Sequence, residues 1–182
     1  ITIVKRSQGQ SAVAGAAYQS GERLFSEYDQ KTKFYNKKKE LVRAEIMLPS
    51  HAPPEYADRA TLWNAVEAVE NQWNSQLARR IVLAFPVEVP KEQYLSMIKE
   101  FCQEQFVSKG MIVDFAIHDK RDGNPHAHIL LTLRAMDEHG KWLPKARKVY
   151  DLDENGERIR LPSGNWKCHK ENTVDWNDQK YA

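Results

Sequence analysis

Little in the sequence points to a secreted or membrane protein. Only two cysteines occur among the 182 residues. Cys102 and Cys168 stand far apart and form no CxxC pair, which excludes a disulfide scaffold and fits a reducing compartment. No stretch approaches 18 consecutive apolar residues, so we expect no membrane insertion. The first residues also lack the basic and then apolar pattern of a signal peptide. A cytoplasmic protein is therefore expected.

Net charge is also nearly absent, but the charged residues are unevenly spread. The formal net charge is only +2. Residues 1–43 carry nine Lys or Arg against four Asp or Glu, whereas residues 44–76 carry one against five. A basic N-terminal quarter is typical of a protein that meets phosphate, although a solvated face would have the same composition.

Length and composition indicate a folded domain. Hydrophobic residues make up 41% of the chain, which is enough for a core, and charged residues make up 29%. A length of 182 residues fits one domain, and we find no internal repeat and no low-complexity tract. The chain opens on Ile1 rather than Met and ends at Ala182 just after an acidic, tryptophan-containing segment. We therefore expect a longer natural protein, with residues 1–182 as its N-terminal part.

The spacing of apolar residues predicts an α+β fold with a roughly five-stranded, largely antiparallel sheet and three flanking helices. Ser11 is a candidate N-cap and Gly21 a candidate stop for the first helix. Residues 31–39 are polar and basic and predict a loop or short hairpin, and Asn155-Gly156 predicts a hairpin turn. Strands are expected at 1–5, 42–48, 80–85, 111–118 and 126–133, and helices within 9–21, 59–76 and 91–107.

Three of the six histidines, His118, His126 and His128, fall within eleven residues. Residues i and i+2 of a strand point to the same face, so His126 and His128 are expected to be neighbours on one side of the sheet. The polar turn at 119–125 brings the chain back, so that His118 can stand beside them. Three imidazoles at one end of a sheet leave other coordination positions open, which a catalytic cation needs. The pattern therefore predicts a metal site.

Tyr18 lies in a predicted helix made almost wholly of small residues. Small side chains let another chain approach closely, and the helix start near Ser11 is expected to offer free N–H groups to phosphate. A tyrosine hydroxyl can attack phosphorus and hold the cut strand covalently. Composition alone favours a packing role for Tyr18, because aromatic residues are mostly core residues. Tyr28 and Tyr35 are alternative nucleophiles in the basic loop.

Several segments form an ordered pattern along the chain. The first is GQSA at 9–12 with AAY at 16–18 and SGERL at 20–24, and a later one is NPHAH at 124–128 with His118 upstream. Shorter matches are LWN at 62–64, GMIVD at 110–114 and DWN at 175–177. Together these segments resemble the MobA/MobL-type relaxases, within the HUH endonuclease group, over nearly the whole chain.

The resemblance implies a specific activity. Tyr18 would attack the scissile phosphate at the nic site of a plasmid transfer origin, leaving a 5′-phosphotyrosine and a free 3′-OH that can later be rejoined. His118, His126 and His128 would hold a divalent cation, Mg²⁺ or Mn²⁺ in cells, with Ni²⁺, Co²⁺ or Zn²⁺ able to replace it in vitro. The implied partners are single-stranded or hairpin origin-of-transfer DNA and relaxosome or coupling proteins.

The sequence departs from the family at one position. Relatives usually have Arg-Glu where this chain has Arg79-Arg80, and Arg80 cannot act as a base because it is a permanent cation. Asp114 and Asp119 are the candidate substitutes for that base. Position and charge suggest a set of residues that contact DNA: Lys5, Arg6, Gln10, Ser11, Arg23 and Arg80.

Three other classes of protein share parts of this pattern. Rolling-circle replication initiators use the same chemistry, but their histidine motif typically precedes the tyrosine, whereas here Tyr18 precedes His126 by 108 positions. A metal nuclease that activates water would need no Tyr18. A noncatalytic single-strand-binding module would stack bases on aromatic residues but would not need an open metal site.

Overall fold

The computed structural model describes residues 1–36 and 39–177 and is built on one five-stranded sheet. Every neighbouring pair of strands in this sheet is antiparallel, which confirms the predicted fold class. The strands in spatial order are β1 (Thr2–Lys5), β5 (Gln76–Ala84), β7 (His126–Leu131), β6 (Val113–His118) and β4 (Leu41–Met47).

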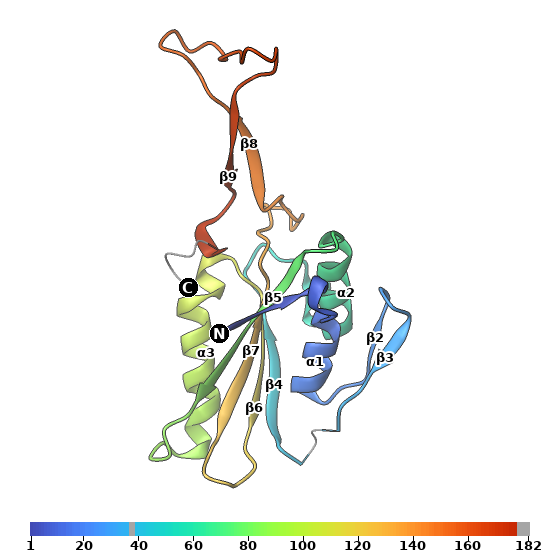
Figure 1. Ribbon diagram of the computed structural model, residues 1–182. Coiled ribbons are helices and arrows are strands. Elements are labelled where there is room, and N and C mark those ends of the chain that lie inside the picture. The colour runs from blue at the N-terminus through green and yellow to red at the C-terminus, as the bar shows by residue number, and fades with distance from the viewer. Residues whose placement is uncertain (37–38, 178–182) are drawn as a thin grey trace.

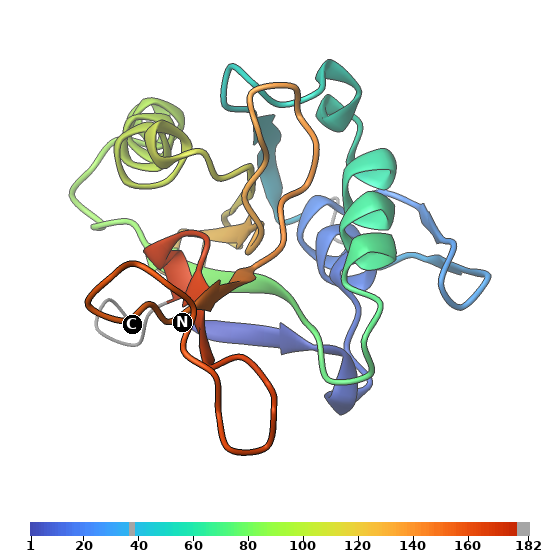
Figure 2. The same ribbon diagram turned by 90° about the horizontal axis from the view of Figure 1, so that it is seen from above.

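Helices cover both faces of the sheet, as Figures 1 and 2 show. On one face, α3 (Tyr94–Gln105) packs on Val113, Phe115 and Ile117 of β6. On the other, α1 (Ala12–Ser20) and α2 (Arg59–Val69) pack on each other and on a second apolar cluster that includes Leu130. Alternate residues of β6 therefore serve opposite faces, and Asp114, Ala116 and His118 point to the side of α1.

The first helix begins and ends as predicted. The side chain of Ser11 accepts a hydrogen bond from the N–H of Ala14, and Gly21 closes the helix in the left-handed region, at φ 70°. Both ends of α1 are therefore fixed by local sequence.

The second helix is shorter than predicted. It ends at Val69 instead of extending to residue 76, and Trp73, which lies within the predicted helix span, is 75% exposed. The guanidinium of Arg6 donates to the carbonyls of Glu67 and Glu70 at the helix end. These contacts satisfy carbonyls that further helical turns would otherwise use. Strand β5 consequently starts at Gln76, four residues before its predicted start.

Two ribbons project from the central domain. Strands β2 (Leu24–Ser26) and β3 (Lys31–Lys33) form a hairpin beside α1, in the region predicted as a loop or short hairpin; residues 37 and 38 of that region lie outside the described residues. Strands β8 (Ala146–Tyr150) and β9 (Cys168–Asn172), which the sequence analysis did not predict, form a long arm seen at the top of Figure 1. The predicted turn at Asn155-Gly156 lies within this arm, beside a bridge between Leu152 and Arg158.

Short 3-10 helices complete the described part of the chain. They span Arg6–Gln8, Pro54–Ala57, Lys91–Gln93, Val107–Lys109 and Asp175–Asn177. Over the residues that the structure describes, no helix is long and apolar enough to cross a membrane. Both cysteines are free: Cys102 is buried and Cys168 exposed.

Candidate active site

The three clustered histidines converge at one end of the sheet. His118 of β6 stands directly opposite His126 of β7, and His128 follows two residues later on the same face. The ring centroids are 5.7 Å apart for His118 and His126, 4.8 Å for His118 and His128, and 4.9 Å for His126 and His128. One nitrogen of each ring lies within 4.8 Å of the others, so the three could hold one metal ion.

Backbone carbonyls orient two of these rings. Nε2 of His118 lies 2.6 Å from the carbonyl oxygen of Gln19, and Nδ1 of His126 lies 2.8 Å from that of Asn124. Because a carbonyl only accepts, the ring nitrogens are the donors, and the lone pair lies on Nδ1 of His118 and on Nε2 of His126. Such outer partners fix the tautomer and the ring direction of metal-binding histidines.

Tyr18 lies on α1 beside this triad. Its ring meets that of His128 edge-on, with centroids 6.1 Å apart, and the side chain is 39% exposed. Tyr35, which follows β3, packs edge-on against Tyr18 at 5.6 Å. Tyr18 therefore stands between a candidate metal ligand and a second tyrosine.

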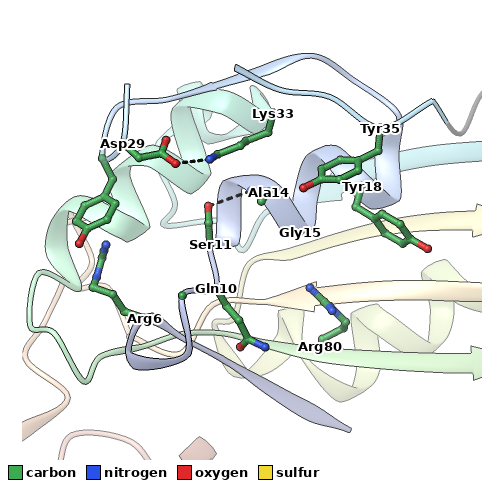
Figure 3. A pocket seen from close by; sticks show the side chains of 12 residues that line it. Arg6, Gln10, Ser11, Ala14, Gly15, Tyr18, Asp29, Lys33, Tyr35 and Arg80 are labelled. Atoms are coloured by element: carbon green, nitrogen blue, oxygen red, sulfur yellow. Dashed lines mark hydrogen bonds and ion pairs between the residues drawn. The ribbon is translucent and has the colours of Figure 1, made fainter. Parts of the chain in front are cut away.

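A cleft of about 560 Å³ runs along α1 to Tyr18. Figure 3 shows Arg6 at one end, Tyr18 and Tyr35 at the other, and Ser11, Ala14 and Gly15 between them. Of the predicted DNA contacts, Lys5 and Arg23 are absent from the cleft lining, and the Arg23 guanidinium lies 5.0 Å from the ring centre of Phe34. The predicted contacts that do line the cleft are Arg6, Gln10, Ser11 and Arg80.

The start of α1 does not offer free donors to phosphate, and that prediction was wrong. One oxygen of Glu67 accepts from Ser11 Oγ at 2.7 Å, from the Ala12 N–H at 2.7 Å and from the Val13 N–H at 3.2 Å. Glu67 is only 3% exposed. An acidic side chain of the protein itself thus occupies the position that we had expected an anion to take.

Arg6 is a structural residue as much as a surface cation. Its Nε and Nη2 donate to the carbonyls at the end of α2, as described above. Its guanidinium also lies 3.8 Å from the ring centre of Tyr28, close enough for a cation–π contact. Of the predicted cations in the cleft, Arg80 is the one next to α1. A Cβ atom added at Gly15 would lie only 3.1 Å from a guanidinium nitrogen of Arg80.

Asp114 is not placed to act as a base. Its carboxylate is fully buried and accepts from Nε of Arg59 at 2.9 Å and from Nε1 of Trp63 at 2.8 Å. Burial alone would lower the pKa of Arg59, but the carboxylates of Asp114 and Glu22 raise it above its ordinary value. The carboxylate therefore belongs to a buried ion pair that ties α2 to β6.

Asp119 is also directed away from the triad, because it follows His118 and alternation along the strand turns it to the other face. It accepts from the Arg121 N–H at 2.8 Å and pairs with Lys91 at 3.1 Å. The Arg121 N–H and the Lys91 ammonium hold the pKa of Asp119 below its ordinary value. A low pKa makes this carboxylate a weak base.

Sequence reasoning missed two residues that build the site. Gln19 is 2% exposed. Its side-chain amide donates to the backbone carbonyl of Asp114 at 2.9 Å, and its own backbone carbonyl accepts from Nε2 of His118. Glu67 lies next to Val66, on the apolar side of α2, where an acidic residue is unusual without a partner. The apolar position of Glu67 could have indicated a buried partner for its carboxylate, whereas nothing in the sequence indicated a role for Gln19.

Known proteins resemble this chain along most of its length. It is 36% identical over 173 residues to the conjugal transfer protein TraA of Agrobacterium fabrum, covering 90% of this chain and 15% of that protein. It is 36% identical over 182 residues to the probable mobilization protein MobA of Bifidobacterium longum, covering 97% of this chain and 32% of that protein. The chain therefore spans less than a third of either relative.

A solved structure has the same fold. It was described under the heading "Molecular Basis of Vancomycin Resistance Transfer in Staphylococcus aureus", and its TM-score is 0.78 at 33% sequence identity. The match covers 98% of this chain and 80% of the other. In addition, residues 10–182 match the MobA/MobL family over almost the whole chain. The ordered pattern of motifs, the sheet with its histidine triad and these matches agree: the chain belongs to the MobA/MobL family.

Proposed function

We propose that residues 1–182 form a relaxase nicking domain that cuts and rejoins one DNA strand at a transfer origin through Tyr18. The observation that carries this proposal is the position of Tyr18, edge-on to His128 at 6.1 Å and beside three converging imidazoles. A phenol so close to a cation site can reach a phosphate bound there. The relatives named for conjugal transfer and mobilization support origin DNA as the substrate.

The donor set of the triad fits a divalent cation. Three neutral imidazoles on one side of an ion leave positions open for a substrate oxygen. Nitrogen ligands suit Mn²⁺ better than Mg²⁺, which prefers oxygen ligands. Of these two ions we therefore propose that Mn²⁺ binds more tightly. When bound, such an ion would offset the charge that develops on the phosphate oxygens.

In the proposed step, Oη of Tyr18 attacks the phosphorus, so that an Oη–P bond forms and the P–O3′ bond breaks. The phenol loses a proton and the departing 3′ oxygen gains one. Because one phosphodiester replaces another, the 3′-OH can later attack the phosphotyrosine and restore the strand. Asp114 and Asp119 are committed to other partners, so we assign neither as the proton acceptor.

The test is to incubate the protein with Mn²⁺ and single-stranded transfer-origin oligonucleotides and to separate the products on denaturing protein gels. Wild type is expected to give a DNA-shifted protein band. Tyr18→Phe and His126→Ala are expected to give none, whereas Tyr28→Phe and Tyr35→Phe should keep it because they leave the proposed nucleophile in place.

Two outcomes would overturn this assignment. A band that survives in Tyr18→Phe and disappears in Tyr35→Phe would make Tyr35 the nucleophile. Cleavage without any shifted band, equal in wild type and Tyr18→Phe, would favour a nuclease that activates water.

A further inference from the structure

Small side chains form the floor of the cleft that leads to Tyr18. Ser11, Ala14, Gly15 and Tyr18 all line it, and their spacing of three, four and seven residues places them on one face of α1. The floor therefore consists of two small residues and a serine that end at the candidate nucleophile. By helical rise the floor is about 10 Å long, which is enough for a short stretch of an extended strand. Its small side chains offer too few polar groups to recognise bases by themselves.

Aromatic side chains form one wall of the cleft. Tyr28 lies between β2 and β3, and Tyr35 follows β3; they are 65% and 40% exposed. Both line the cleft together with Tyr18. Single exposed rings are ordinary on a protein surface, but two that line one groove form a row on which flat ligands can stack.

Each ring has a fixed position. The Arg6 guanidinium lies 3.8 Å from the centre of the Tyr28 ring, and its hydrogen bonds to the end of α2 hold it there. Tyr35 is positioned by its edge-on contact with Tyr18 at 5.6 Å. Held rings lose little conformational freedom when a base stacks on them, so they bind flat ligands at low cost.

Positive charge lies on the same cleft, but it is not all available. Lys33 is paired with Asp29, and Nε and Nη2 of Arg6 donate to the carbonyls at the end of α2. Arg80 lies on the opposite wall, on β5, close to Gly15. A ring on one wall and a guanidinium on the other would contact, respectively, the base and the phosphate of one strand.

We infer that the segment between α1 and residue 35 is a base-stacking wall for single-stranded DNA, in which Tyr35 stacks on the base beside the scissile phosphate and Tyr28 on a base further along the strand. Arg80 contacts the backbone from the opposite side. This inference rests on the proposed function for the location of the scissile phosphate, but the stacking itself needs neither the metal nor the hydroxyl of Tyr18.

The experiment measures binding without chemistry. The background is the full chain carrying Tyr18→Phe, in EDTA, and the readout is fluorescence anisotropy with labelled oligonucleotides of about 12 nucleotides. One probe is oligothymidine, and the second has the same backbone with every base removed. Adding Tyr35→Ala or Tyr28→Ala is expected to weaken oligothymidine binding about tenfold and to leave binding of the abasic probe unchanged. Tyr35→Trp should restore the affinity.

The matched control is Phe101→Ala. Phe101 is 37% exposed on α3, on the opposite face of the sheet, and should leave both affinities unchanged. Arg80→Ala should weaken both probes alike and reduce the salt dependence of binding.

Equal affinity of the two probes for the Tyr18→Phe background, or equal effects of Tyr35→Ala and Phe101→Ala, would overturn the inference. Thermal unfolding of each variant shows whether a loss reflects misfolding, in which case Tyr35→Trp and Tyr28→Phe decide the result. Because no cleavage is scored, a failure of the nicking assay leaves this result intact, and the two proposals can fail separately.

Discussion

The carbonyl oxygen of Gln19 accepts a hydrogen bond from Nε2 of His118 at 2.6 Å. Gln19 follows the candidate nucleophile directly in the chain, and His118 belongs to the triad. The helix that carries Tyr18 is therefore attached to the candidate metal site through its own backbone. A shift of the end of this helix would also rotate the imidazole ring of His118.

Replacing the Gln19 side chain should weaken metal binding. Its amide holds the end of α1 to β6 through the carbonyl of Asp114 at 2.9 Å. Without that bond the Gln19 carbonyl is less well placed, and Gln19→Ala is expected to lower Mn²⁺ affinity about tenfold in isothermal titration calorimetry. Ser20→Ala is the control, because it removes a buried hydrogen bond within α1 itself. Equal losses in both variants would contradict a role for this contact.

Gly15→Ala should weaken single-strand binding without lowering the stability of the fold. Alanine is up to about 1 kcal/mol more favourable than glycine inside a helix, so unfolding by urea should need the same or more denaturant. The new Cβ would lie 3.1 Å from a guanidinium nitrogen of Arg80, which must shift by a few tenths of an ångström, and it would add bulk to the cleft lining. We expect weaker single-strand binding in the anisotropy assay. Unchanged affinity would contradict a strand that lies against Gly15 on the floor of the cleft.

Asp114→Ala should destabilise the protein by roughly 3 kcal/mol, because it leaves the Arg59 guanidinium buried without its main partner. Urea unfolding measures this loss. Arg43→Ala, which breaks an exposed pair with Glu45, should cost less than about 1 kcal/mol. A stable Asp114→Ala protein that has lost nicking activity would restore Asp114 as a candidate base.

The N-cap of α2 should give the stability a dependence on acid pH. Hydrogen bonds from the Thr61 hydroxyl and N–H hold the pKa of Asp58 below its ordinary value of 3.8. The stabilisation is therefore complete above pH 3.8 and is lost as the pH falls through the lowered pKa of the folded state. Asp58→Ala should lose about 1 kcal/mol at pH 7, whereas Asp58→Asn should keep most of the stability there. A pH profile identical in wild type and Asp58→Asn would contradict the assignment.

The sheet and its histidines could be predicted because their signals are local. Alternation in 126–131 placed His126 and His128 on one face, and the short turn at 119–125 returns the chain antiparallel, which sets His118 opposite His126. The caps of α1 at Ser11 and Gly21 are also local signals. The roles of these residues in cleavage stay predictions, since geometry brings groups together without showing a reaction.

Other features depend on contacts between distant parts of the chain. Glu67 reaches the start of α1 across 55 residues, and Arg6 ends α2 across 61, so neither contact could be read from spacing. Strands β8 and β9 were missed because their residues, ARKVY and CHKEN, pair only with each other and bury no apolar face. A two-stranded ribbon without a core leaves no hydrophobic period in the sequence.

The carboxylate of Glu67 also shapes the electric field over the cleft. It neutralises the positive end of the α1 dipole from inside the protein. An approaching polyanion is therefore not drawn onto the helix axis, and the attraction comes from the guanidinium groups along the rims, Arg80 above all. If DNA binds as proposed, a strand guided by such a field would lie lengthwise beside the helix, and this orientation would carry its backbone past Tyr18.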